Sequence, residues 1–263
     1  MPPSRTYARI RAGEVTCFAE LLDELCVELD AAPWLNGRLT GRSWRRDAVR
    51  FLAPVTPSKI VCVGLNYREH IAESVGVLGA LAPPADPLLF LKPSSAIVGP
   101  GEPIRYPRGV TRLDPEAELG VVIGRELRRA SAAEAAEGIA GLTVFNDVSA
   151  RNYQKSDGQW TRAKGFDTFA PVGPVVVCGL ASEHRIIELR VNGELRQRGD
   201  TADLIVAVPE LLRYISGIMT LYPGDLIATG TPAGIAPVSV GDQISISIDG
   251  IGTLDNPVAE DHD

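Results

Sequence analysis

Proline and glycine divide this chain into short segments, and that division favours strands over long helices. The 263 residues include 20 prolines and 26 glycines. Between them lie short apolar runs that are typical of strands, most of them after residue 58. These runs are Lys59–Val63, Leu88–Leu91, Leu119–Ile123, Leu142–Phe145, Pro174–Cys178, Ile186–Val191, Asp225–Ala228 and Gln243–Ile248. Many strands, few helices and no regular βαβ alternation predict a mixed α/β fold that is mostly β.

Local signals place a few turns and helices within this pattern. Asn192-Gly193 separates two strand-like stretches and predicts a hairpin. Ala132–Ile139 is rich in Ala and Glu and follows Ser131, which predicts a helix with a capping box. Leu204–Ile218 has apolar residues at helical spacing and predicts a second helix.

A proline-containing junction, residues 52–58, separates a small N-terminal unit from the more regular part of the chain. We place a boundary near residue 56, which predicts a small N-terminal domain over residues 1–56 and a larger domain over residues 57–263.

The charge and the cysteines bear on partners and location. The formal net charge of −7 argues against nucleic acid or an anionic membrane as a partner. The four cysteines include no C-x-x-C pair, which favours free thiols in a reducing compartment. No secretory signal and no run long enough to span a membrane is recognisable, so we expect a cytoplasmic protein.

Three carboxylates stand at the ends of apolar runs. Glu116 and Glu118 are two residues apart before a Val-Val-Ile run, so on a strand they share one face. Asp147 ends the run that begins at Leu142. Like charges on one face repel unless a cation lies between them, and hard divalent cations prefer oxygen ligands. The pattern indicates a metal site; the alternative is a pair of solvated glutamates on an edge strand.

His70 and Glu73 form a second candidate group. Asn66 as N-cap and Glu69 at the capping-box position predict a short helix, on which His70 and Glu73 share a face. A glutamate beside an imidazole fixes its tautomer, and the imidazole can then activate water. The alternative is an exposed helix with an ordinary ion pair. The Gly-, Ala- and Pro-rich residues 75–87 that follow predict either a lid over a site or a surface loop.

Taken together, these motifs occur in one order along nearly the whole chain. They are Lys59–Tyr67 with His70 and Glu73, Phe90–Pro93 with Val98–Gly101, Glu116–Gly124, Phe145–Gln154, Lys164–Phe169, Tyr222–Gly234 and Gly250–Asn256. In this respect the chain resembles the fumarylacetoacetate hydrolase family. The sequence departs from many members at Asn152, where they carry aspartate, and at Gly165, where they carry serine.

The resemblance implies a β-sandwich roll with a small N-terminal domain, and a homodimer. It implies that Glu116, Glu118 and Asp147 hold Mg²⁺ or Mn²⁺, and that His70 and Glu73 activate water. Lys164 is implied as a catalytic residue. The resemblance implies that Gln154 and Thr231 contact the substrate, and we expect Arg151 and Tyr153 to contact it as well.

The family's chemistry leaves several reactions open. Our leading expectation is C–C bond hydrolysis or isomerisation of a small 2-oxo acid, such as a β-diketo or dioic acid of aromatic catabolism. Both reactions would proceed through a metal-stabilised enolate. Decarboxylation of oxaloacetate-like acids is the alternative. A ligand-binding protein without turnover is a second alternative, because fold and function can separate.

Overall fold

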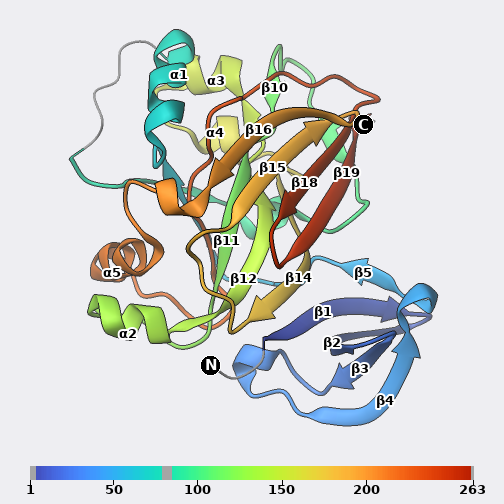
Figure 1. The fold of residues 1–263 in the computed structure, drawn as a ribbon. Coiled ribbons are helices and arrows are strands. Elements are labelled where there is room, and N and C mark those ends of the chain that lie inside the picture. The colour runs from blue at the N-terminus through green and yellow to red at the C-terminus, as the bar shows by residue number, and fades with distance from the viewer. Residues whose placement is uncertain (1–3, 79–84, 262–263) are drawn as a thin grey trace.

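The computed structural model describes residues 4–78 and 85–261, so the expected lid over residues 75–87 lies partly outside the described residues. Most of its ordered elements are strands (Figure 1). One large sheet contains β1 (Arg5–Ala12), β2 (Val15–Leu22), β3 (Leu25–Leu29), β4 (Leu39–Arg45), β5 (Arg50–Leu52), β6 (Ile60–Gly64), β7 (Leu88–Lys92), β8 (Ile97–Val98), β11 (Ala117–Ile123), β12 (Ile139–Asn146), β14 (Ala170–Cys178) and β17 (Leu226–Ala228). Its main path runs β4-β3-β2-β1-β14-β12-β11-β17-β6-β7.

A second sheet packs on the first. It has the order β16-β15-β18-β19-β9 and consists of β9 (Ile104–Tyr106), β15 (Ile186–Val191), β16 (Glu194–Asp200), β18 (Gln243–Ile248) and β19 (Gly252–Glu260). Two short strands, β10 (Leu113–Asp114) and β13 (Ser149–Ala150), pair with each other as a separate two-stranded sheet. The helices are α1 (Arg68–Leu78), α2 (Ala132–Glu137), α3 (Arg151–Asp157), α4 (Thr161–Lys164) and α5 (Val208–Ile218).

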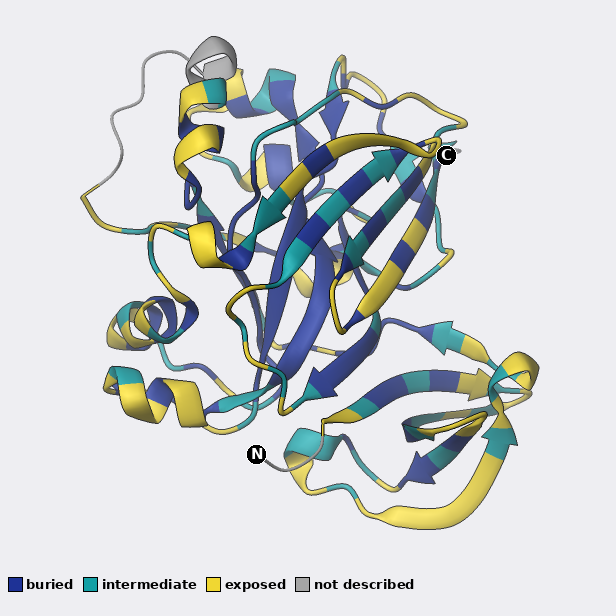
Figure 2. Ribbon diagram, viewed as in Figure 1, coloured by how far each residue is buried: buried dark blue, intermediate teal, exposed yellow. Residues whose placement is uncertain are grey.

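The core lies between these two sheets. Every residue of β11 is buried, and β11, β12 and β14 form the dark central strands of Figure 2. β12 and β14 pack against β18 and β19 of the second sheet. The alternating strand β18 turns Ile244, Ile246 and Ile248 inward, as its period of two requires. Strands anchored in such a core hold side chains at their ends in fixed positions.

The N-terminal strands β1–β5 form the separate lower unit of Figure 1. β1 joins this unit to the remaining strands of the large sheet, because Arg5, Thr6 and Tyr7 pair with Cys178, Val177 and Val176 of β14. The mostly β fold with a small N-terminal domain is therefore confirmed. The boundary near residue 56 stays a prediction; Ala53 and Val55, just before it, are buried in a cluster with Ile60 of β6.

Two expected helices have different bounds, and the hairpin is as expected. The first helix ends at Glu137, because Ile139 already begins β12; its capping box between Ser131 and Glu134 is present. The second begins at Val208 rather than Leu204, because Pro209 favours the first turn of a helix. Asn192 and Gly193 have φ of 51° and 82° in the turn between β15 and β16.

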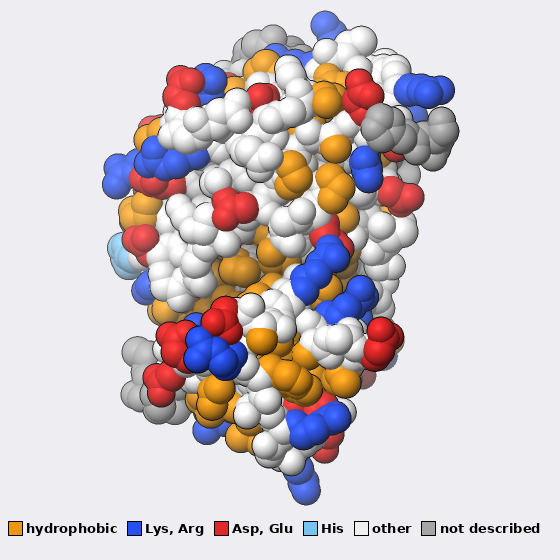
Figure 3. All heavy atoms as spheres, turned by 90° about the vertical axis from the view of Figure 1, so that its right-hand side faces the viewer, with side chains coloured by type: hydrophobic (Ala, Val, Ile, Leu, Met, Phe, Trp, Pro, Cys, Tyr) orange, Lys and Arg blue, Asp and Glu red, His pale blue; other side chains and the backbone are white. Residues whose placement is uncertain are grey.

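Acidic and basic side chains are intermixed over the face shown in Figure 3, with hydrophobic side chains gathered toward its middle. Among the described residues, none of the helices has the length and apolar character needed to cross a lipid bilayer.

Candidate metal centre

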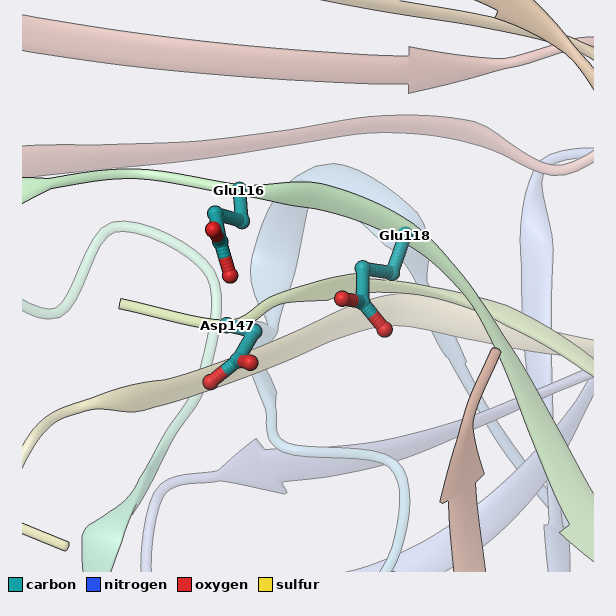
Figure 4. Close-up of side chains that lie close together, drawn as sticks. All are labelled: Glu116, Glu118 and Asp147. Carbon is teal, nitrogen blue, oxygen red and sulfur yellow. The ribbon is translucent and has the colours of Figure 1, made fainter. Parts of the chain in front are cut away.

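Three buried carboxylates converge where β11 begins and β12 ends. The antiparallel pairing of Ala117 with Asn146 places Glu116 next to Asp147, and the Asp147 N–H donates to the Glu116 carbonyl at 2.9 Å. Glu118 follows on the same face of the chain, as its spacing predicts. One carboxylate oxygen of each of the three residues lies within 4.8 Å of the others (Figure 4). All three side chains are buried, so the alternative of solvated glutamates on an edge strand is wrong.

Cationic side chains surround two of the three carboxylates. Lys164 Nζ donates to Glu116 at 2.7 Å and to Asp147 at 2.6 Å, and thus bridges the ends of the two strands. Arg151 Nη2 donates to Glu116 at 2.5 Å. Burial opposes the charged form of Glu116, but Arg151 and Lys164 outweigh it and hold the pKa of Glu116 well below its usual range.

Glu118 is in the opposite electrostatic situation. Its one hydrogen bond among the described residues comes from the Gly230 N–H at 2.8 Å, and it has no ion pair there. Burial, together with the neighbouring charges of Asp147 and Glu116, raises the pKa of Glu118 well above its usual range. The cluster therefore contains one carboxylate with no ion-pair partner among the described residues, although the charge of Lys164 partly offsets the rise in its pKa.

This donor set fits a hard divalent cation. Three carboxylates supply oxygen ligands only, which suits Mg²⁺ or Mn²⁺ rather than a metal that prefers sulfur or nitrogen. A cation between them would also stabilise the charged form of Glu118, which burial and the neighbouring carboxylates otherwise disfavour.

His70 lies between the carboxylate cluster and Glu73. Its Nδ1 is 3.4 Å from Glu73 Oε2, and its Nε2 is 3.9 Å from Glu116 Oε1. The imidazole is buried, so the alternative of an exposed helical pair is wrong. Glu73 also accepts hydrogen bonds from the Gly234 N–H at 3.1 and 3.2 Å. Burial raises the pKa of Glu73, but His70 and backbone N–H groups that hydrogen-bond to it have the opposite effect. On balance the pKa of Glu73 is lowered.

The expected capping role of Asn66 is wrong, although α1 does form. The Asn66 amide donates to the carbonyls of Val206 and Thr229 and accepts from the Val206 N–H. Its side chain is therefore used to hold two distant loops beside β6 rather than to cap the helix.

The expected substrate-contacting residues divide into two groups. Gln154, Thr231 and Arg151 line the small pocket around the carboxylates, together with His70 and Lys164. The Thr231 hydroxyl donates to the Ala117 carbonyl and accepts from Gln197, so its O–H group already donates a hydrogen bond within the protein.

Tyr153 is not among the residues that line this pocket. Its ring packs against Phe166 and beneath the Arg162 guanidinium, which lies 3.9 Å from the ring centroid. This placement does not support the predicted contact between Tyr153 and substrate.

Two buried ionic residues at the centre were not foreseen in these roles. Lys92 donates to Asp147 at 2.5 Å from the end of β7, and Asp114 accepts from Arg151 at 2.9 Å. The role of Lys92 could have been predicted from the sequence, because this lysine ends the apolar run Leu88–Leu91 and a charge in a buried strand needs a partner. Asp114 gave no comparable signal.

Fold and site together define a mostly β protein with a buried acidic centre. The model of the family described as "Fumarylacetoacetate (FAA) hydrolase C-terminal" matches residues 59–259, and the model "Rv2993c-like, N-terminal" matches residues 5–54. The chain therefore belongs to the fumarylacetoacetate hydrolase family, as its motifs predicted.

Named relatives cover nearly the whole chain. Protein Rv2993c of Mycobacterium tuberculosis is 49% identical over 260 residues, which is 95% of this chain and 96% of that protein. The crystal structure of 2-hydroxyhepta-2,4-diene-1,7-dioate isomerase from Mycobacterium marinum superposes with a TM-score of 0.90 at 45% identity, covering 98% of this chain and all (100%) of the other. The mitochondrial oxaloacetate tautomerase FAHD2B of Bos taurus is 42% identical over 226 residues, 81% of this chain and 70% of that protein.

Proposed function

We propose that this protein is a divalent-metal-dependent enzyme that isomerises a small 2-oxo acid by moving a proton between its enol and keto forms. The observation that carries the proposal is the convergence of three buried carboxylates within 4.8 Å, with the His70 imidazole beside them. The relatives named as an isomerase and as an oxaloacetate tautomerase support this reaction type.

Glu116, Glu118 and Asp147 would hold Mg²⁺ or Mn²⁺. A bound divalent cation would supply the positive charge that stabilises a 2-oxo acid as its enolate. Lys164 adds a fixed positive charge at the same place, because its Nζ is already held by Glu116 and Asp147. Arg151 keeps Glu116 ionised and in position through a second hydrogen bond to that carboxylate.

His70 is the group that would accept and return the proton. Its Nδ1 faces Glu73 and its Nε2 faces the carboxylate cluster, so Nε2 is the nitrogen on the side of the pocket where the substrate would bind. Glu73 is a positioning residue, since it contacts the imidazole and the Gly234 backbone rather than the cluster. Such a partner fixes the tautomer and the ring orientation.

Hydrolysis of a C–C bond is the second candidate, and the same His70–Glu73 pair favours it. If water rather than a substrate carbon occupied the pocket beside His70, the imidazole would take a proton from that water. Decarboxylation of oxaloacetate-like acids and ligand binding without turnover are the remaining outcomes of the test below.

The test is a substrate panel with metal-free protein to which Mg²⁺ or Mn²⁺ is returned. The enol of oxaloacetate, 2-hydroxyhepta-2,4-diene-1,7-dioate and an acylpyruvate are supplied, and the products are identified. Metal-dependent ketonisation or isomerisation supports the proposal, and cleavage products support hydrolysis. Loss of CO₂ supports decarboxylation, and metal-dependent binding without turnover supports the ligand-binding alternative.

Two variants distinguish the loss of the metal centre from a general effect of substitution on the protein. Glu116→Ala should abolish metal-dependent turnover, because it removes both a ligand and the partner of Lys164 and Arg151. Glu183→Ala is the matched control, since Glu183 is exposed and lies in a loop outside the pocket. Equal activity of the two variants would contradict the assignment of the centre.

Four expectations from the sequence stay predictions. They are the homodimer, the cytoplasmic location, a role in aromatic catabolism, and the absence of nucleic acid and membrane partners. Light scattering at working concentrations checks the first of these directly.

A further inference from the structure

Two hollows of very different size meet at Trp160. The small pocket around the carboxylates has a volume of about 20 Å³. A cavity of about 1090 Å³, here called the β7 cavity, runs along β7 and the link between α3 and α4. Phe90, Gln154 and Trp160 line both hollows. These three side chains therefore form the wall that divides them.

The small pocket cannot hold a substrate with this wall in place. A water molecule needs roughly 10–15 Å³ of such volume, so about 20 Å³ accommodates about one water and no 2-oxo acid. The carboxylates stand at the ends of fully buried strands and have no room to retreat. The small pocket also shares Val63, Gly64 and Leu65 with a hollow of about 80 Å³, but of these two neighbours only the β7 cavity, at about 1090 Å³, has room for a chain of several carbon atoms.

Trp160 is the member of the wall with the least support from the core. It is partly exposed and is the N-cap residue of the short helix α4. Gly158 and Gln159, which precede it, are both exposed, and Gly158 has a φ of 70°. Gln154, by contrast, is buried and bonded to Arg151 at 2.8 Å.

The contacts of the indole nevertheless define one position for it. Its ring lies edge-on to Phe90, with the centroids 5.2 Å apart and the planes at 72°. A Cβ atom at residue 64 would lie 2.8 Å from its Cζ3, so the absence of a side chain at Gly64 leaves the space that the indole fills. The Lys164 N–H donates to the Trp160 carbonyl at 2.9 Å. The same helical turn therefore fixes the positions of both the indole and the Lys164 ammonium group.

On the basis of the proposed function, we propose that the β7 cavity is the subsite for the part of the substrate beyond its 2-oxo acid end, and that Trp160 positions that part. The cavity walls include apolar side chains such as Leu89, Phe90 and Pro93. The substrate class is therefore a 2-oxo acid whose carbon chain continues for several atoms past the keto group. Either acid requires the indole to turn aside, but only a long acid then extends into the β7 cavity and packs against the indole; a compact acid such as oxaloacetate leaves the cavity empty and does not gain this contact.

The experiment compares a short and a long substrate in Trp160→Ala, Trp160→Phe and wild-type protein with Mg²⁺. Ketonisation of oxaloacetate enol and isomerisation of 2-hydroxyhepta-2,4-diene-1,7-dioate give kcat and KM. Calorimetry with oxalate and with saturated 2-oxoheptanedioate gives affinities that do not depend on turnover. Trp34→Phe is the matched control, because Trp34 packs against Phe18 in the N-terminal unit.

Trp160→Ala should lower kcat/KM for the seven-carbon acid by about tenfold, mainly through KM, and change that for oxaloacetate by less than about threefold. The affinity for 2-oxoheptanedioate should fall in parallel, while oxalate binding is retained. Trp160→Phe keeps a ring against Phe90 and should lose about threefold on the long acid alone. If Trp160→Ala does not fold, the comparison rests on this second variant.

The two proposals fail in different ways. If wild-type protein neither binds nor converts either acid with Mg²⁺ or Mn²⁺, the proposed function is overturned, and the subsite with it. If wild-type protein converts both acids and the Trp160 variants change the ratio no more than Trp34→Phe does, the subsite alone is overturned.

Discussion

Lys92 Nζ lies 2.5 Å from Asp147 Oδ1, and both side chains are almost completely buried. The same carboxylate accepts from Lys164 through its other oxygen. Burial favours the neutral form of Lys92 and lowers its pKa, although the charge of Asp147 opposes this. Asp147 is therefore fixed from two sides before any metal binds, which prepares its position at the end of β12.

We first predict that Lys92→Met destabilises the fold. Removing one partner of a buried ion pair leaves the other charge uncompensated, and the free energy of unfolding should fall by about 3 kcal/mol. Urea unfolding in the presence of a chelator measures this change. Lys155→Met is the control, because Lys155 is exposed. A loss no greater than that of the control would show that Lys164 alone suffices for Asp147.

The second prediction concerns the pH dependence of the metal-free protein. The pKa of Glu118 is raised in the folded state, so its contribution to stability is present below its unfolded value and is lost as pH rises through the folded pKa. Stability should therefore increase as pH falls from neutral toward about pH 5, and this mild acidification should raise Tm. Glu118→Gln should raise Tm at neutral pH and remove this rise.

Metal should reverse the effect of that substitution. In wild-type protein, added Mg²⁺ or Mn²⁺ should raise Tm at neutral pH, because a ligand that binds only the folded state stabilises it. Glu118→Gln should lose most of this increase. Thermal unfolding with and without chelator measures both quantities, and an equal metal response in the two proteins would remove Glu118 from the ligand set.

Third, the His70–Glu73 pair should affect turnover rather than folding. His70→Asn should lower kcat by about 10²–10⁴-fold, the usual contribution of a positioned acid–base group. Glu73→Gln should lower it by roughly tenfold, because the imidazole keeps its place but loses the partner that fixes its tautomer. Glu69→Gln on the same helix is the exposed control. A Glu73→Gln protein with unchanged kcat and an unshifted pH–rate profile would mean that Glu73 only holds the Gly234 segment.

Fourth, Gly64 and Trp160 should be energetically coupled. Gly64→Ala places a methyl group about 2.8 Å from the indole, and overpacking of this kind costs about 1–3 kcal/mol of stability. Trp160→Phe shortens the ring and should recover part of that loss in the double variant. The coupling energy from the four proteins checks this; strict additivity would mean that the indole moves aside without cost.

The strands and the acidic centre could be predicted because both depend on local patterns. Gln243–Ile248 alternates strictly and forms β18 with those same bounds, and the two-residue spacing of Glu116 and Glu118 placed them on one face. Asp147 could be added because it ends an apolar run. The Asn192-Gly193 hairpin depends on the left-handed backbone that those residues tolerate, so its signal was also local.

What could not be predicted depends on contacts between distant parts of the chain. Asn66 had the composition of a helix cap, but loops about 140 and 163 residues away use its amide instead. Tyr153 lies one residue before Gln154, yet the turn of α3 directs it toward Phe166 rather than the pocket. The burial of Asp114 and its pairing with Arg151 arise only once β10 and β13 are side by side.

The pairing of Arg5, Thr6 and Tyr7 with β14 gives the N-terminal unit a protective role. Without it, the backbone donors and acceptors around Val176 to Cys178 would form an open sheet edge, and open edges recruit strands from other molecules. A shortened chain that begins at β6 would thus retain every residue of the acidic centre and still be prone to aggregate. The first fifty residues cover the β14 edge and make β4 the outer strand on that side of the sheet.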